Sequence, residues 1–136
     1  MVLDASALVA LFKAEPGADV VAALFADPTV EVFAHAANLC EVFHAIWRFE
    51  DEARAHAVIQ ELALAGLVER ADMDGAFWRD AGALIAARRI AKSSFPLGDA
   101  LGVALARRLD AEFVTSDKHE VEPLHNAGLV KARFIR

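Results

Sequence analysis

The sequence predicts a three-layer α/β/α sandwich built on a mainly parallel sheet. Short apolar runs alternate along the chain with longer segments whose apolar residues recur at helical spacing. This alternation is typical of parallel strands that are joined by helices covering both faces of the sheet. The 136 residues suit one domain, and no repeat or Ser-, Gly- or Pro-rich linker divides them. We therefore expect residues 1–136 to fold as a single unit.

The strands are expected at the short apolar runs, because each run is too short for a helix and is followed by polar or helix-forming residues. These runs are Val2–Leu3, Val30–Ala34, Leu67–Val68, Glu112–Thr115 and Val130–Ile135.

The segments between the runs carry apolar stripes that predict helices. One stripe consists of Leu97, Leu101 and Leu105 within the segment 97–109, and a second consists of Phe77, Leu84 and Ile85. Three residues mark expected helix ends, with a proline suited to a first turn and two glycines suited to C-termini. These residues are Pro16, Gly66 and Gly128.

The composition predicts a globular protein of the cytoplasm. Apolar residues make up 57% and charged residues 25% of the chain, which excludes a disordered or fibrous protein. The single cysteine, Cys40, rules out an internal disulfide, favours a reducing compartment and is expected to be a small buried apolar residue. The N-terminal Met-Val-Leu-Asp does not resemble a secretory signal, and no apolar stretch reaches the roughly 18 residues of a membrane span.

Four acidic residues occupy positions that suit ligand binding. Asp4 and Asp117 follow predicted strands, and ligands of parallel sheets bind beyond the carboxyl ends of the strands. Glu41 and Asp99 are isolated charges within apolar helical segments, where an unpaired buried carboxylate is costly. If the four residues meet at one end of the sheet, their oxygens form a site for a hard divalent cation.

Helix capping is the alternative explanation for three of these acids. Asp4, Asp99 and Asp117 each stand where an N-cap is possible, and Glu120 completes a capping-box pattern with Asp117. Glu41 lies several residues inside its helical segment, so capping does not explain it.

The chain resembles the PIN domains, and among them the small VapC-type toxins. The resemblance rests on Val-Leu-Asp-Ala-Ser-Ala-Leu, Asn-Leu-Cys-Glu-Val, Leu-Gly-Asp-Ala-Leu-Gly-Val-Ala-Leu-Ala and Phe-Val-Thr-Ser-Asp, which occur in this order over nearly the whole chain. It implies a Mg²⁺- or Mn²⁺-dependent endoribonuclease, the toxin of a toxin–antitoxin pair, with a cognate antitoxin as partner. It also implies the strand order 3-2-1-4-5.

The resemblance assigns roles to six residues. Asp4, Glu41, Asp99 and Asp117 correspond to the acidic metal site. We expect the first three to bind the ion directly, and Asp117 to act through water or to hold a second ion. Ser6 and Thr115 correspond to the hydroxyl residues that support the acids. The expected substrate is single-stranded or looped RNA.

The net charge of −6 at first argues against a nucleic-acid ligand. The objection weakens because four carboxylates belong to the expected site, and bound cations would neutralise them. A basic cluster of Arg88, Arg89 and Lys92 precedes Asp99 and is expected to contact phosphates. Arg107 and Arg108 are either a second such cluster or a solvated helix face.

Three other functions were considered. Two Glu-x-x-His motifs, at Glu41 and Glu122, resemble di-iron helix bundles, but Pro123 disfavours a helix through the second motif and the strands do not fit a bundle. An aspartyl-phosphate phosphatase would use Asp4 as nucleophile, but such enzymes carry another Asp where this chain has Ser6. A non-catalytic binding module would have no reason to keep the four acids. The histidines at 35, 44, 56, 119 and 125 are interpreted as structural or solvent-facing.

A segment rich in large apolar residues suggests a partner surface. Phe43, Ile46 and Trp47 cluster on one helix face, whereas Phe49 points elsewhere, so one small core is not expected to hide all four. We expect part of this surface to contact the antitoxin or a second copy of the chain in a homodimer.

Overall fold

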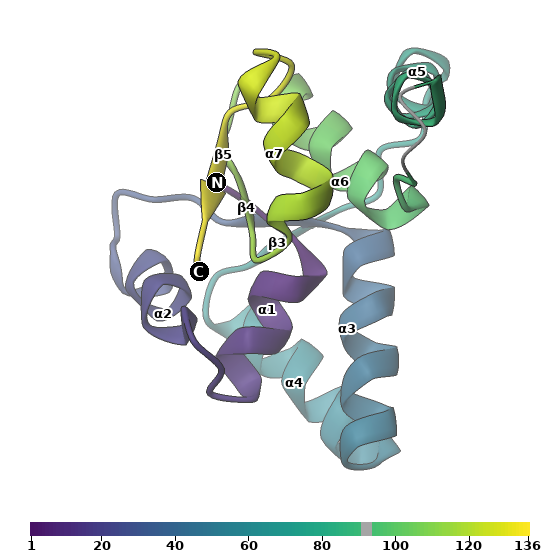
Figure 1. Cartoon of the computed structure of the whole chain (residues 1–136). Helices are drawn as coiled ribbons and strands as arrows, with labels where there is room; N and C mark the ends of the chain where they lie inside the picture. Colours follow the sequence, from purple (N-terminus) through teal and green to yellow (C-terminus); the bar gives the residue numbers. More distant parts are fainter. Residues whose placement is uncertain (91–93) are drawn as a thin grey trace.

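The central sheet of the protein has five parallel strands in the order β3-β2-β1-β4-β5 (Figure 1). The computed structural model describes residues 1–90 and 94–136. The strands are β1 (Val2–Leu3), β2 (Phe33–His35), β3 (Val68–Arg70), β4 (Phe113–Thr115) and β5 (Ala132–Phe134). The predicted α/β/α class and the strand order 3-2-1-4-5 are confirmed, and each strand overlaps one of the five apolar runs.

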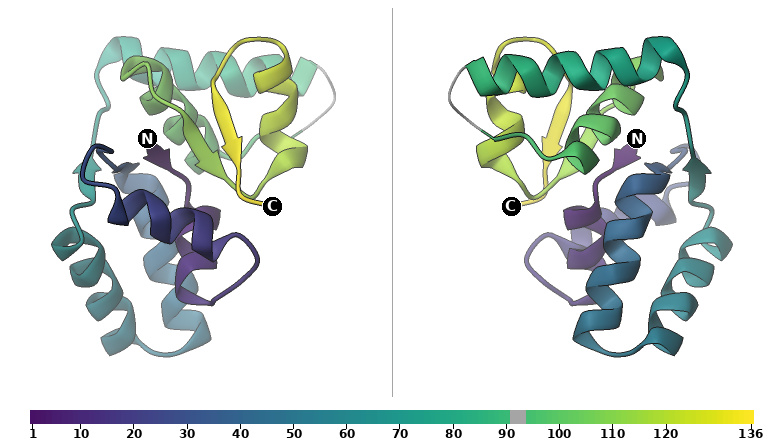
Figure 2. Two further views of the ribbon diagram at one scale, coloured as in Figure 1. Left: turned by 90° about the vertical axis from the view of Figure 1, so that its left-hand side faces the viewer. Right: turned by 90° about the vertical axis from the view of Figure 1, so that its right-hand side faces the viewer.

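The described helices form two layers, one on each face of the sheet (Figure 2). One layer contains α1 (Ala5–Phe12), α2 (Ala18–Ala26), α3 (Ala36–Phe49) and α4 (Glu52–Leu64). The other contains α5 (Gly75–Ile90), α6 (Leu97–Arg108) and α7 (Lys118–Asn126). Successive strand residues point to opposite faces, so Leu3 and Val114 join the first core while Val2 and Phe113 join the second.

The predicted helix ends are confirmed at both glycines. Gly66 follows α4 with φ +100° and Gly128 follows α7 with φ +70°, a conformation that favours glycine. At each end, a backbone N–H bonds back five residues, as from Leu67 to the Leu62 oxygen at 3.0 Å. The expectation for Pro16 was wrong, because α2 begins two residues later at Ala18 with Gly17 as its N-cap.

The apolar stripe of α6 is shorter than predicted. Leu101 and Leu105 are buried, but Leu97 is 62% exposed because it is the first residue of the helix and lies beyond the packed turn. In α5, Phe77 and Leu84 are buried as expected, and Ile85 packs against the same core.

Helix α7 runs through Pro123, contrary to the sequence-based expectation. Proline has no N–H to donate to the carbonyl of His119, four residues earlier. In its place, Nη2 of the buried Arg88 lies 3.4 Å from the His119 oxygen and donates to it. A side chain from α5 thus supplies a donor that the backbone lacks. The parallel sheet therefore excludes the di-iron helix bundle, whereas Pro123 gives no argument against it.

Several apolar side chains remain at the surface. Cys40 is exposed on α3, so its expected burial was wrong. Ile46 enters the core, and Phe43 packs edge-on against Trp47 with ring centroids 5.7 Å apart. Trp47 and Phe49 are 45% and 62% exposed, in agreement with the predicted surplus of apolar surface. No helix among the described residues is long and apolar enough to cross a membrane.

Gly102 lets α6 approach its neighbours closely. A Cβ atom on Gly102 would lie 2.6 Å from Cε2 of Phe113 and 2.9 Å from Oδ1 of Asn38. Both neighbours are buried and come from different elements, β4 and α3. Gly102 therefore determines how closely α6 can pack on the sheet and on α3.

The first prediction concerns this packing. Gly102→Ala is expected to lower the free energy of unfolding by about 1–3 kcal/mol, because overpacking outweighs the better helix propensity of alanine. Gly82→Ala on α5 is the matched control, since its Cβ would meet nothing within 4 Å. The control is expected to gain about 0.5–1 kcal/mol. Urea denaturation measures both, and equal stability of the two variants would contradict the packing argument.

Candidate metal centre

The chain order of the elements brings several acids to the carboxyl edge of the sheet. Asp4 directly follows β1, and Asp117 lies just beyond the end of β4. Helix α3 starts immediately after β2, which places Glu41 in its second turn, and Asp99 lies in the first turn of α6. Because parallel strands end at a common edge, residues that are distant in sequence meet there.

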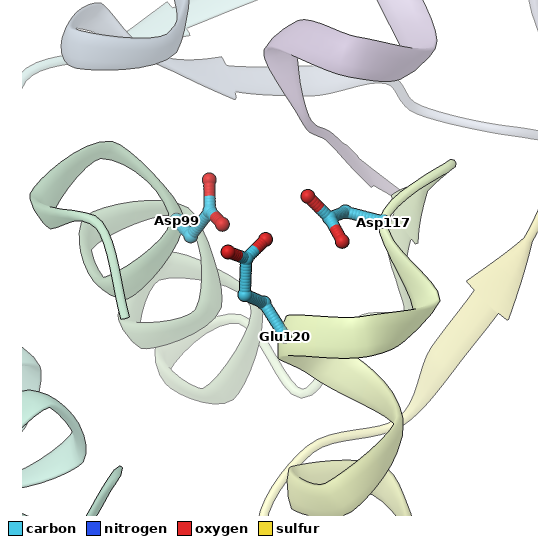
Figure 3. A group of neighbouring side chains, drawn as sticks. All are labelled: Asp99, Asp117 and Glu120. Carbon is cyan, nitrogen blue, oxygen red and sulfur yellow. The ribbon is translucent and has the colours of Figure 1, made fainter. Parts of the chain in front are cut away.

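Three carboxylates approach one another closely at this edge. Asp99 on α6, Asp117 on the loop after β4, and Glu120 on α7 point toward one another (Figure 3). Each residue offers an oxygen that lies within 4.8 Å of the other two. Two oxygens on opposite sides of a Mg²⁺ ion would be about 4 Å apart, only slightly less than this spread. Within the described ranges, these three are the acids close enough to share one cation.

Asp4 lies beside this triplet as a buried and hydrogen-bonded carboxyl group. It is 2% exposed, and its Oδ2 accepts bonds from Ser6 Oγ at 2.6 Å and from Thr115 Oγ1 at 2.8 Å. Its Oδ1 accepts a bond from Asn38 Nδ2 at 3.2 Å. Although Asp4 occupies the N-cap position of α1, its side chain makes no capping bond, so capping does not explain this residue.

The two hydroxyl residues named from the sequence contact Asp4 and also the loop that carries Asp117. Ser6 Oγ accepts a bond from the backbone N–H of Ser116 at 3.0 Å. Thr115 Oγ1 accepts one from the backbone N–H of Asp117 at 2.9 Å. The hydroxyls therefore join the start of α1 to the end of β4 and orient the loop at the site.

Asn38 is a member of the site that the sequence analysis did not single out. It is fully buried on α3, and its Nδ2 donates to Asp4 Oδ1 and, at 3.3 Å, to the backbone oxygen of Gly98. It thus links α3, α6 and the end of β1. The only available signal was its place three residues before Glu41, one helical turn away on the same face.

Glu41 is exposed, whereas the sequence suggested a buried charge. Its carboxylate lies against the backbone of α6, where a Cβ atom on Gly98 would overlap Glu41 Oε1. Partial burial, and next the charge of Asp4, raise the pKa of Glu41. Glu41 therefore faces the site from its solvent side and falls outside the Asp99 triplet.

Burial and the negative charges of neighbouring acids shift the protonation of Asp99 strongly. Burial and the surrounding acids raise its pKa to about 8, far above the ordinary 3.8. In decreasing order, the acids responsible are Asp4, Glu120, Glu41 and Asp117. All four acids named from the sequence therefore lie near enough to interact electrostatically at this edge.

The protonation of Glu120 is also shifted, by its contact with Asp117. Its hydrogen bond to Asp117, followed by burial and the charge of Asp117, raises the pKa of Glu120 to about 7. A capping box was the alternative explanation for this pair, but the Asp117 side chain makes no capping bond to α7. The Asp-x-x-Glu spacing was therefore the signal for a second acid, and its functional reading was missed.

The basic residues expected to contact RNA are only partly available for it. Arg88 is buried beneath α7, whereas Arg89 is exposed, and Lys92 lies outside the described residues. Arg107 pairs with Asp80 at 3.2 Å, and Arg108 pairs with Asp72 at 2.8 Å. The interpretation of Arg107 and Arg108 as a solvated helix face agrees with these ion pairs.

Two of the histidines have the structural roles expected of them. His35 is the N-cap of α3, where its Nδ1 accepts a bond from the Ala37 N–H at 3.1 Å and its Nε2 donates to the Asp72 oxygen at 3.0 Å. His125 accepts a bond from the Ala132 N–H at 3.2 Å, which ties α7 to β5.

The donor set fits a hard divalent cation. Every side chain of the triplet offers carboxylate oxygen, the ligand type that Mg²⁺ and Mn²⁺ prefer. The raised pKa values of Asp99 and Glu120 mean that the site lacks compensating positive charge when these groups ionise. A cation would supply that charge.

A sequence model of one protein family matches most of the chain. The model describes the PIN domain, and the match covers residues 1–122. No curated protein matches the chain by sequence.

Several solved structures share the fold at low sequence identity. A toxin–antitoxin complex from Klebsiella pneumoniae is 19% identical, with a TM-score of 0.70 over 99% of this chain and 97% of that one. VapC20 of Mycobacterium tuberculosis, described as a toxin that cleaves the sarcin-ricin loop, is 17% identical, with a TM-score of 0.72 over 90% and 93%. DNA-bound VapBC from Salmonella typhimurium is 12% identical, with a TM-score of 0.74 over 99% and 97%.

The second prediction follows from the raised pKa of Asp99. The folded state holds the proton more tightly than the unfolded chain, so the free energy of unfolding of the metal-free protein should fall as pH rises from about 4 to about 8. Asp99→Asn should make the free energy of unfolding less dependent on pH, and near pH 8 this variant should be more stable than the wild type. Thermal denaturation in EDTA over this pH range measures the effect.

The matched control for this experiment is Asp110→Asn. Asp110 is exposed, and its bond to Lys131 lowers its pKa, so it titrates below this range in both states. The control should therefore keep the wild-type decline. A decline that is equally steep in Asp99→Asn would show that Asp99 is not the group responsible.

Proposed function

The chain belongs to the PIN domain family, and from this premise we propose that it is a Mg²⁺- or Mn²⁺-dependent endoribonuclease, the toxin of a toxin–antitoxin pair. The observation that carries the proposal is the crowding of five acids at one edge of the sheet, where burial and then the neighbouring negative charges raise the pKa of Asp99 to about 8. Such crowding costs stability, and a scaffold without a ligand would gain nothing from it.

Direct cation ligands in this proposal are Asp99, Asp117 and Glu120, because their oxygens already lie within one cation's reach. Glu41 closes the site from the solvent side. Asp4 belongs to the same site, but its two oxygens already accept three side-chain hydrogen bonds. It would therefore bind an ion only by giving up or sharing one of them, and otherwise acts by its charge and by orienting the loop of Asp117.

When bound, the cation would lower the pKa of a water and neutralise charge on the cleaved phosphate. The chain's own residues supply the other requirements. Ser6 and Thr115 hold the loop of Asp117 in place through backbone bonds, so the ligands need little rearrangement. Glu120, whose pKa is raised to about 7, holds a proton near neutral pH that cation binding would release. The exposed Arg89 is a proposed contact for a flanking phosphate.

The aspartyl-phosphate alternative is less well supported. Its nucleophile would be Asp4, but this side chain is 2% exposed, and both of its oxygens already accept side-chain hydrogen bonds. A nucleophile must reach its substrate, whereas this carboxyl group points into the protein.

We also propose an antitoxin as the partner and a homodimer as the assembly. The support is the surplus of exposed apolar side chains, together with the toxin–antitoxin complexes among the structures that share the fold. The exposed residues are Trp47, Phe49, Leu64, Val68, Met73, Trp78, Leu97 and Leu129. An Arg or Lys of the antitoxin entering the acid cluster in place of the cation would silence the enzyme.

The third prediction tests the nuclease. The wild type should cleave single-stranded or looped RNA with Mg²⁺ or Mn²⁺ and stop in EDTA. Asp99→Asn should lower the rate at least about 100-fold while the protein stays folded, because Asn keeps the shape and loses the charge. Gly98→Ala should also lower the rate, since its Cβ displaces the Glu41 carboxylate.

Asp110→Asn serves as the control in this assay, because it removes an exposed carboxylate that follows the C-terminus of α6, whereas Asp99 lies in the first turn of that helix. Gel analysis of RNA fragments gives the rates. Cleavage that persists both in EDTA and in Asp99→Asn would contradict the nuclease, and hydrolysis of small phosphate esters would favour the phosphatase.

The fourth prediction tests the toxin role in cells. Expression of the wild type alone in a susceptible bacterial host should arrest growth, because uncontrolled RNA cleavage stops protein synthesis. Asp99→Asn, expressed to the same level, should relieve the arrest. Growth curves with immunoblots measure both, and normal growth with intact, soluble wild type would contradict the toxin while leaving the nuclease assay unaffected.

A further inference from the structure

A basic pocket lies between the ends of α1 and α3. It has a volume of about 310 Å³ and is lined by Lys13, His44, Ala45, Arg48 and Phe49. Lys13 is the C-cap of α1, and the other residues belong to the last two turns of α3. No acidic residue lines this pocket, although the chain as a whole carries a net charge of −6.

The two strong cations of the pocket are not neutralised by the protein. In the described part of the chain, neither Lys13 nor Arg48 takes part in an ion pair, whereas seven other Arg and Lys residues do. The acids nearest in sequence pair elsewhere, with Glu15 bound to Arg136 at 2.9 Å and Glu50 lying 3.8 Å from Arg54. The pocket therefore offers free positive charge to a ligand.

The pocket and the acid cluster lie on one path along α3. Glu41, Ala45 and Arg48 are spaced four and then three residues apart, so they share one face of the helix. At 1.5 Å per residue, Arg48 lies about 10 Å further along the axis than Glu41. Helices α1 and α3 both start at the carboxyl edge of the sheet and extend away from it (Figure 1).

We propose that this basic pocket binds a backbone phosphate of the RNA substrate, a few nucleotides at most from the phosphate that is cleaved. The proposal rests on the proposed nuclease function. Phosphates of a duplex strand advance about 3.4 Å each along the helix axis, and those of a single strand can lie further apart, so the distance of about 10 Å along α3 is within the reach of a few nucleotides. The pocket is thus a substrate subsite separate from the acids.

The side chains of the pocket suit a nucleic-acid strand. Lys13 and Arg48 supply the charge that phosphate contacts need. Phe49 is 62% exposed, with Lys13 Nζ 4.3 Å from its ring centroid, so one ring face carries a cation and the ring also offers a surface to a base. An acidic peptide would satisfy the charge alone, but a strand of RNA also connects the pocket with the cleavage site.

The fifth prediction tests this subsite by binding. The probe is a fluorescein-labelled oligouridine of about 12 nucleotides, a length within the usual range for single-strand sites. All proteins carry Asp99→Asn, so that the probe is not cut, and Mn²⁺ is present. Fluorescence anisotropy gives Kd over a range of salt concentrations. Lys13→Ala with Arg48→Ala should raise Kd about ten-fold and reduce the slope of log K against log salt by about 1.

Two matched variants accompany this measurement. Lys131→Ala with Arg133→Ala removes the same charge from the exposed Lys131 beside β5 and the half-buried Arg133 within β5, which pair with Asp110 and Glu112. This variant should leave Kd within about two-fold of the parent. Lys13→Arg with Arg48→Lys keeps the charge of the pocket and should retain binding, which separates a lost phosphate contact from a damaged fold.

Four outcomes would overturn the subsite. If the alanine double variant binds the probe as tightly as its parent, the subsite is contradicted. Cleavage of RNA by the chain with Asp99 intact would in that case still support the proposed nuclease. Equal weakening by both charge-removing variants would show only general attraction by the surface. Unchanged RNA binding combined with lost binding of polyglutamate would assign the pocket to an acidic peptide. A parent that neither binds the probe nor, with Asp99 intact, cleaves RNA overturns both the subsite and the proposed function.

Discussion

The carboxyl group of Asp4 lies at the end of the central strand, where it is almost entirely removed from water. Such a group is tolerated only if donors or a proton compensate for the lost hydration, and burial accordingly raises its pKa. The donors come from α1, β4 and α3, as Ser6, Thr115 and Asn38. Satisfying one carboxyl group therefore specifies how three elements meet, and the other acids are positioned by the same contacts.

Close approach of α6 completes the arrangement and also creates its electrostatic cost. Gly98 and Gly102 lack the Cβ atoms that would meet Glu41, Phe113 and Asn38, so α6 brings Asp99 into the field of the other acids. A stable scaffold would separate these charges, since like charges that cannot all ionise destabilise the folded chain. A bound cation would offset this cost, and its binding would then couple the protonation, the metal occupancy and the stability of this edge.

The sequence predicted the sheet and the location of the site because both depend on local patterns. Apolar runs identify strands, and acids after strands of a parallel sheet share an edge. Features that depend on tertiary partners were not predictable in this way. Pro123 remains helical only because Arg88 replaces a missing donor, and Cys40 is exposed because α3 turns that face outward. Glu120 has a local pattern that fits both capping and cation binding, and only the position of Asp99 distinguishes the two.

The net charge of −6 is compatible with an RNA ligand because the charges are distributed unevenly. Eight of the acids outside the site lie in ion pairs, as do seven of the basic residues, so the paired charges contribute little to the electric field around the protein. The charges outside these pairs include a cluster of carboxylates at one end of α3 and a basic pocket toward the other end. A strand of phosphates can follow this helix only when a cation covers the acids. Metal binding would thus act on substrate affinity as well as on chemistry, and the same face without metal would repel RNA and attract a basic partner segment.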